Sequence, residues 1–155
     1  MEAKKAFHKG EVPVGAVLVY KGEIIERSHN HIEQFQDASC HAELLCLQQG
    51  AKKLGNWRLL ETTLYSTLEP CPMCAGALFL FRVKRIVYGA PDLRHGAAGT
   101  VFNVLNRPHP IHAIEVVGGI CAEESKMLLQ DFFRNRRKSH DFRQGLAAGE
   151  SIDAL

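Results

Sequence analysis

Two short segments of the sequence carry side chains that could bind one metal ion. His41 stands in the first, and Cys71 and Cys74 stand three residues apart in the second. Residues at i and i+3 share one face of a helix, and a helix N-terminus stabilises a thiolate. Two thiolates and one imidazole suit zinc. The pattern predicts a zinc ion held by these three ligands, with a fourth position open to a water molecule whose pKa would fall to about 7.

Glu43 lies two residues after His41 and is predicted to do the proton chemistry of this site. Residues at i and i+2 do not share a helix face, so both are not expected to bind the same ion. With His41 at the entrance of a helix, Glu43 can face the bound water and the substrate. A carboxyl group there takes a proton from water and passes it to a leaving nitrogen. Glu43 is therefore the candidate catalytic residue.

The cysteines allow two other interpretations. A C-x-x-C pair that follows a strand and opens a helix is also typical of a redox dithiol, but that interpretation leaves the nearby H-x-E segment unexplained. A structural zinc site would need a fourth ligand, which Cys40, Cys46 or Cys121 could supply. Both segments open helices, where catalytic metal sites are built, so the open site is favoured.

Hydrophobic periodicity places these segments in a chain of alternating strands and helices. We expect helices over 1–10, 41–54, 70–82 and 122–138, strands over 14–20, 23–28, 62–68, 85–88 and 114–117, and loops over 29–40 and 89–100. The first two strands form a hairpin, and the later strands are expected to be parallel. The order predicts one α/β domain over residues 1–138 with helices on both faces of the sheet, followed by a flexible tail over 139–155.

Composition narrows the class of protein without naming a partner. The chain has 155 residues, the size of one domain, and a net charge of +2 is too balanced to indicate a ligand. No apolar run approaches 18 residues, so no membrane span is expected. Five cysteines at irregular spacing do not form a disulfide framework, and the N-terminus does not resemble a secretion signal. We therefore expect a cytoplasmic protein.

The two metal-binding segments also match a known signature, H-x-E followed by P-C-x-x-C, which marks zinc-dependent base deaminases. Beyond it, the sequence over residues 6–138 resembles the bacterial tRNA-specific adenosine deaminase (TadA) family. The segments that carry this resemblance include Glu11-Val12-Pro13-Val14-Gly15, Thr67-Leu68-Glu69-Pro70-Cys71, Gly96-Ala97-Ala98-Gly99 and Phe132-Phe133-Arg134. One departure is Cys40, where the family usually has Ala before the metal-binding His.

The resemblance implies a fold, an activity and a set of contacts. The fold would be a cytidine deaminase-like, three-layer α/β/α sandwich with a mixed five-stranded sheet. The activity would be conversion of adenosine to inosine at the wobble position of a tRNA, typically the arginine tRNA with anticodon ACG. The family also implies a homodimer with one zinc ion per subunit. Asn30 would hydrogen-bond the flipped base, and Ala42 is a second candidate substrate-binding residue.

Contacts to the tRNA anticodon stem-loop are expected from a loop and from the end of the last helix. The candidate RNA-binding residues are Asp92, Arg94, Phe133, Arg134, Arg136 and Arg137. Basic side chains beside aromatic ones suit phosphates and unpaired bases, although a basic run is also a common solvated face, and Asn or Asp often only caps a turn. Two other functions stay open: deamination of a free base or nucleotide of the guanine or cytosine type, and an RNA-binding module with a structural zinc.

Overall fold

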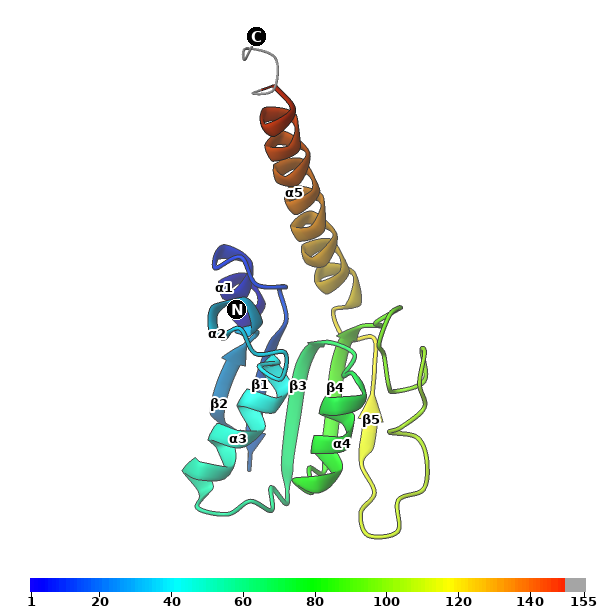
Figure 1. Ribbon diagram of the computed structural model, residues 1–155. Coiled ribbons are helices and arrows are strands. Elements are labelled where there is room, and N and C mark those ends of the chain that lie inside the picture. Colours follow the sequence, from blue (N-terminus) through cyan, green and yellow to red (C-terminus); the bar gives the residue numbers. More distant parts are fainter. Residues whose placement is uncertain (150–155) are drawn as a thin grey trace.

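The computed structural model describes the backbone of residues 1–149 and the side chains of residues 1–138 (Figure 1). Its elements follow the order α1 (Glu2–His8), β1 (Gly15–Tyr20), β2 (Glu23–His29), α2 (Ile32–Phe35), α3 (Ala42–Leu54), β3 (Thr62–Leu68), α4 (Pro72–Leu80), β4 (Arg85–Ala90), β5 (Glu115–Val117) and α5 (Ala122–Gly149). In the part of the chain that is described, no helix is long and apolar enough to cross a membrane.

The five strands form one mixed sheet in the order β2-β1-β3-β4-β5. β1 pairs antiparallel with both β2 and β3, whereas β3, β4 and β5 run parallel to one another. The hairpin between β1 and β2 turns at Lys21 and Gly22, which both have positive φ, as a two-residue turn between twisted strands requires. The expected mixed sheet and parallel later strands are confirmed.

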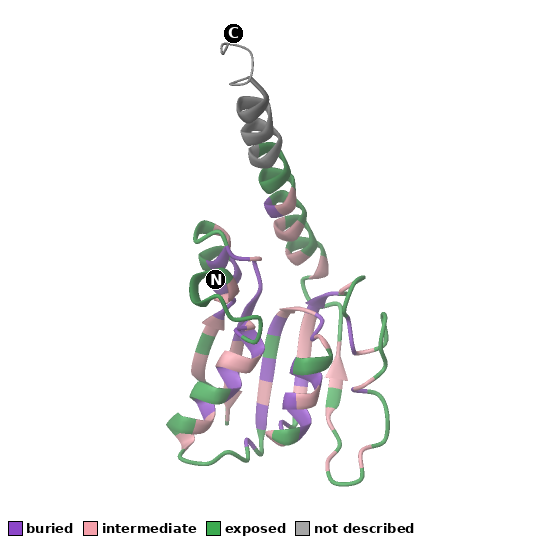
Figure 2. Cartoon of the chain, in the orientation of Figure 1, coloured by how far each residue is buried: buried purple, intermediate pink, exposed green. Residues whose placement is uncertain are grey.

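Helices α3 and α4 cover one face of the sheet and enclose the main core (Figure 2). The core is built from fully buried side chains of both layers, namely Leu18, Leu47, Leu64, Leu78 and Ile86. Alternate residues of a strand point to the same face, which is why the strands present every second side chain to these helices. Packing of this kind holds the N-termini of α3 and α4 side by side at one end of the sheet.

Helix α1 and the beginning of α5 contact the opposite face at that same end of the sheet. A Cβ atom added at Gly15 of β1 would lie 2.5 Å from the backbone nitrogen of Ala3, so only glycine lets α1 approach. A Cβ atom added at Gly89 of β4 would lie 2.7 Å from the hydroxyl of Ser125 in α5. The helices therefore lie on both faces, and the expected α/β/α arrangement is confirmed.

Two elements differ from the sequence prediction. The segment 29–40, expected to be loop, contains the short helix α2 because both oxygens of the buried Glu11 accept its first N–H groups, from Glu33 and Gln34. Helix α5, expected to end at Lys138, continues to Gly149, and residues 139–149 contain no proline that would break it. The expected tail over 139–155 is thus helical as far as Gly149, its flexibility stays a prediction, and its last six residues lie outside the described residues.

Candidate functional site: a histidine-cysteine metal centre

The three predicted metal ligands meet at the N-termini of α3 and α4. The Nδ1 atom of His41 lies 3.6 Å from the sulfur of Cys71 and 3.6 Å from the sulfur of Cys74. All three donor atoms lie within 4.8 Å of one another. His41 and Cys71 are the extended N-cap residues of their helices, and Cys74 lies buried in the first turn of α4. Thirty residues of sequence separate His41 from Cys71, so only the fold brings them together.

The donor set fits a zinc ion. Zinc–sulfur bonds of about 2.3 Å and zinc–nitrogen bonds of about 2.05 Å at a tetrahedral angle place sulfur and nitrogen about 3.6 Å apart. Both measured nitrogen–sulfur distances agree with this separation. Pro72 occupies the first turn of α4, where its missing N–H has no helical partner to lose.

The electrostatics of the site favour thiolate. Hydrogen bonds from Cys74 and from His41 lower the pKa of the Cys71 thiol to about 4. The bond with Cys71 raises the pKa of the His41 imidazole and also raises that of the Cys74 thiol. The surroundings thus favour the thiolate form of Cys71, and a helix N-terminus adds to its stabilisation.

Glu43 lies in the first turn of α3 and is only 3% exposed. Burial raises the pKa of its carboxyl group to about 7. A carboxyl group with a pKa near neutrality can both accept and donate a proton, as general acid-base catalysis requires. Among the described residues, Glu43 is not part of the cluster of donor atoms, as its two-residue separation from His41 predicted.

The side chain of Asn30 holds the entrance of α3. Its Oδ1 atom accepts a hydrogen bond of 2.9 Å from the backbone N–H of Ala42, and both residues are buried. Asn30 therefore does cap a neighbouring backbone segment, which was the alternative to base binding in the sequence analysis. Among the described residues, the Nδ2 group of Asn30 has no hydrogen-bond partner, and its expected contact with a base stays a prediction. The predicted substrate contact of Ala42 stays a prediction, and its N–H is already engaged.

The other cysteines do not complete a fourth protein ligand. Cys40 is 8% exposed, Cys46 is fully buried and Cys121 is exposed. Burial raises the pKa of the Cys46 thiol to about 12, as expected for an inert thiol in a core. Within the described residues, none of the three belongs to the cluster of donor atoms. This arrangement favours an open site over a structural one.

Glu69, which sequence analysis did not single out, organises the loop that follows β4. It is 1% exposed and accepts backbone N–H groups from Asp92 at 3.0 Å, Ala98 at 2.8 Å and Thr100 at 3.3 Å. A charged residue at the end of a buried strand, directly before Pro70, was the signal that could have indicated this role. The bonds tie the loop 91–100 to the residue that follows β3, two positions before Cys71.

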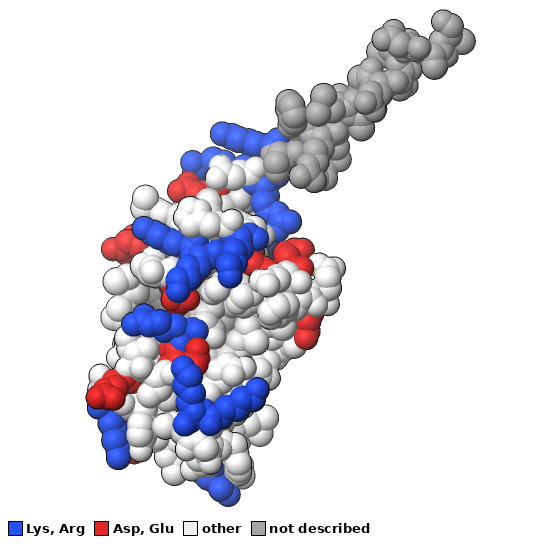
Figure 3. Space-filling view, turned by 90° about the vertical axis from the view of Figure 1, so that its left-hand side faces the viewer, with Lys and Arg blue, Asp and Glu red and all other residues white. Residues whose placement is uncertain are grey.

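Of the residues predicted to bind RNA, Arg94 of the loop after β4 contacts Phe133 in the middle of α5. The guanidinium of Arg94 lies 5.5 Å above the ring of Phe133, while Asp92 caps its own turn through the N–H groups of Arg94 and His95. On the side of the molecule seen in Figure 3, Lys and Arg side chains are interspersed with acidic ones. This side is therefore mixed in charge.

Two of the predicted arginines already have acidic partners. Arg134 lies 3.4 Å from Asp131 in its own helix. Arg136 lies 3.7 Å from Glu33 of α2. Arg137 is exposed one residue further along the helix. The cluster therefore keeps a surplus of positive charge next to α2.

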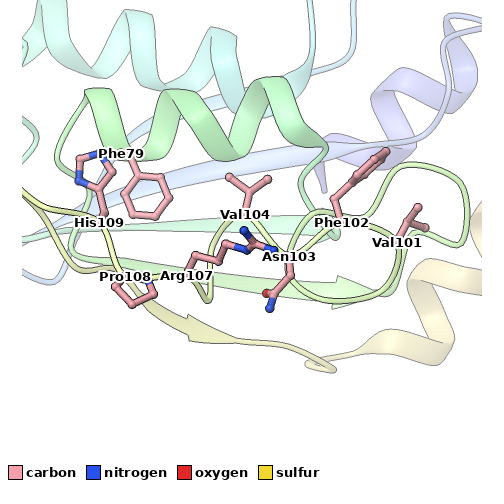
Figure 4. A pocket seen from close by; sticks show the side chains of 8 residues that line it. All are labelled: Phe79, Val101, Phe102, Asn103, Val104, Arg107, Pro108 and His109. Atoms are coloured by element: carbon pink, nitrogen blue, oxygen red, sulfur yellow. The ribbon is translucent and has the colours of Figure 1, made fainter.

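A hollow of about 680 Å³, separate from the cluster of His41, Cys71 and Cys74, lies between α4 and the segment 101–109 (Figure 4). The lining residues come from α4 and from the segment 101–109, and they are Phe79, Val101, Phe102, Asn103, Val104, Arg107, Pro108 and His109. His109 stacks on Phe79 with ring centroids 4.6 Å apart. None of the predicted site residues lines this hollow.

Comparisons with known proteins agree with the fold and the site. The profile of the MafB19-like deaminase family matches residues 1–137. A tRNA-specific adenosine deaminase of Bacillus subtilis is 53% identical over 137 residues, which cover 88% of this chain and 85% of that protein. The chain therefore belongs to the MafB19-like deaminase family and, within it, to the tRNA-specific adenosine deaminases.

Two solved structures of similar chains have the same fold as this protein. A structure from a study of A-to-I editing by tRNA:A34 deaminases matches with a TM-score of 0.78 and 39% identity, covering 82% of this chain and 92% of that chain. A guanine deaminase of Nitrosomonas europaea matches with a TM-score of 0.69 and 22% identity, covering 84% and 78%. At that identity the second likeness concerns the fold alone.

Proposed function

We propose that this protein is a hydrolytic tRNA deaminase that converts the wobble adenosine of an anticodon, as in the arginine tRNA with anticodon ACG, to inosine. The observation that carries the proposal is the cluster of His41, Cys71 and Cys74 beside the buried carboxyl of Glu43. Support for a tRNA substrate comes from the relatives named above and from the basic and aromatic residues in the middle of α5. A cytoplasmic location suits a protein that acts on tRNA.

The proposed metal is one zinc ion per subunit, held by His41, Cys71 and Cys74. Zinc in such a site supplies a nucleophile by lowering the pKa of water. Glu43 would accept the proton that water loses on attacking C6 of adenine and deliver it to ring N1. It would then carry the remaining hydroxyl proton to the amino group, which leaves as ammonia. The balance is adenosine plus water giving inosine plus ammonia.

Asn30 would orient the base during this reaction. Its Oδ1 atom is used by Ala42, which fixes the plane of the amide group and aims the Nδ2 donors away from α3. Adenine presents ring nitrogens as acceptors, which an amide N–H can recognise. An anticodon loop is single-stranded, so its adenosine can leave the stack without opening a duplex.

We further propose that the protein works as a homodimer whose contact includes the exposed end of α4 and the nearby hollow. Leu80 is 70% exposed and Met73 is 38% exposed on α4, and Val101 and Phe102 at the rim of the hollow are 47% and 46% exposed. Exposed large apolar side chains on one element and beside a hollow suit an interaction surface. Sedimentation should give a dimer for the native chain and a monomer for Leu80→Glu; two identical profiles would count against this contact.

The function is tested by incubating the protein with total tRNA and, separately, with free bases, nucleosides and nucleotides. Inosine in tRNA supports the proposal, whereas ammonia from small molecules alone would favour a free-base or nucleotide deaminase. Glu43→Gln should lower turnover by at least about 100-fold while zinc content and RNA binding persist. A Glu43→Gln protein that binds RNA and zinc like the native chain, when the native chain itself releases no ammonia, would indicate an RNA-binding module.

A further inference from the structure

Three rings lie in a row from the buried end of β2 to the surface at α2, with the ring of His29 tilted by 39° from that of His31. His29 is 8% exposed, and its ring centroid lies 4.2 Å from that of His31. His31 in turn stacks on Phe35 with centroids 5.0 Å apart and planes within 10° of parallel. Phe35 is 55% exposed. A large flat ring is therefore held at the surface, supported from below by two imidazoles.

The ring stack is fixed by hydrogen bonds. The carboxylate of Glu11 accepts the N–H groups of Glu33 and Gln34 at 3.1 and 2.8 Å, which anchors α2. The Nδ1 group of His31 bonds the Oε1 atom of Gln34 at 2.9 Å, and the N–H of Phe35 donates to the carbonyl of His31 at 3.0 Å. A platform ordered in advance loses little entropy when a flat ligand stacks on it.

The position of the stack relates it to the metal centre. Residues 31–40 form the connection between Asn30 and His41, which both belong to the site. The N–H of His31 donates to the carbonyl of Cys40 at 3.0 Å, and this hydrogen bond joins the two ends of the connection. The ring stack therefore belongs to a short connection whose two neighbours in sequence, Asn30 and His41, are residues of the candidate site.

Positive charge borders the platform. Arg136 of α5 reaches Glu33 of α2 at 3.7 Å, which brings the basic turn of α5 against the platform. That turn also carries Arg137 and Lys138, and both are exposed. An exposed ring beside several cations is the combination that binds single-stranded nucleic acid, because bases stack on the ring and phosphates pair with the cations.

We propose that His31 and Phe35 form a stacking platform for an unpaired nucleobase adjacent to the target adenosine, an inference that rests on the proposed tRNA substrate. Stacking on an aromatic ring tolerates any base, since every base has a π-face. The platform would therefore hold the loop in place without selecting its sequence. Loss of one such contact typically weakens binding by about 5- to 150-fold.

The test compares Phe35→Ala, Phe35→Trp and Phe35→Leu on an anticodon stem-loop RNA containing the wobble adenosine. Phe35→Ala should raise KM by about 5- to 150-fold with kcat changed by less than about threefold. Phe35→Trp should keep the native KM, and Phe35→Leu, which retains apolar volume without a ring, should resemble Phe35→Ala. Circular dichroism melting confirms that the exposed position leaves the fold intact.

Trp57→Ala is the matched control. Trp57 is also an aromatic residue with half its surface exposed, but it follows the far end of α3, about 20 Å along the helix axis from His41. Its replacement should leave KM unchanged. Equal effects of Trp57→Ala and Phe35→Ala would overturn the platform, because a general loss of exposed aromatic surface would then explain both.

Abasic RNAs identify the partner. Two RNAs carry an abasic nucleotide, one on the 5′ side and one on the 3′ side of the target adenosine. With one of these RNAs, Phe35→Ala should no longer raise KM, because the base that would stack on Phe35 is already absent. Persistence of the full penalty with both abasic RNAs would overturn the proposal. Turnover of the unmodified RNA by the native chain reports separately on the proposed function, so failure of one is not confused with failure of the other.

Discussion

The buried carboxylate of Glu69 offers a sharp test of how the loop 91–100 is held. Its Oε2 atom accepts the N–H of Asp92, and its Oε1 atom accepts the N–H groups of Ala98 and Thr100. No solvent competes, because the residue is 1% exposed. Glu69→Gln preserves the shape of the side chain and one of its oxygens. The NH2 group of the new side chain then faces at least one backbone N–H, and because both groups are donors no hydrogen bond forms between them.

The expected loss follows from these bonds. A hydrogen bond to a charged acceptor contributes about 1.5–3 kcal/mol, and a buried N–H without a partner costs about 1–3 kcal/mol. Since Gln can still serve Ala98 and Thr100 through its oxygen, one such bond is lost. We expect Glu69→Gln to be about 2–4 kcal/mol less stable, which for a chain of this size lowers Tm by roughly 5–15 °C. Glu69→Ala, which frees all three N–H groups, should lose more.

Urea and thermal unfolding of the zinc-loaded protein measure this effect. Glu61→Gln is the control, because the side chain of Glu61 is 63% exposed and pairs with Lys84 at 2.8 Å on the surface. Solvent screens an exposed pair of this kind, so its loss should change stability little. If Glu69→Gln is no less stable than Glu61→Gln, the three hydrogen bonds do not hold the loop and the reasoning fails.

Three further predictions concern the site and α1. Asn30→Asp keeps the acceptor for Ala42 but removes the amide donors, so stability should persist while activity on tRNA falls at least about tenfold; full activity would mean that Asn30 only caps α3. In metal-free protein at pH 6, above the lowered pKa of about 4, Cys71 should react with iodoacetamide, measured by mass spectrometry, while Cys46, with its pKa raised to about 12, should not; zinc should protect Cys71, and equal labelling of the two would contradict this. Gly15→Ala should lose about 1–3 kcal/mol in urea unfolding, because its Cβ would meet the backbone of α1; an unchanged midpoint would show that α1 does not dock there.

What the sequence by itself determined was the chemistry and the order of the elements. Ligand types, their spacing and the periodicity of apolar residues are local properties. They sufficed to propose His41, Cys71 and Cys74 as one metal set, to separate Glu43 from it, and to predict a mixed sheet covered by helices. Helix α2 was not predicted because its four residues are too few to show a helical periodicity. Glu11, which accepts hydrogen bonds from its first N–H groups, also lies more than twenty residues earlier in the chain.

What only the tertiary structure decided were the contacts made across long stretches of sequence. The three buried backbone bonds of Glu69, the use of one end of the Asn30 amide by Ala42, and the packing of Arg94 on Phe133 all join residues from different elements. Each depends on where a backbone N–H or a ring face comes to lie once the layers are packed. No periodicity encodes this, because the energy of such a contact exists only after the sheet and helices have brought its two partners together.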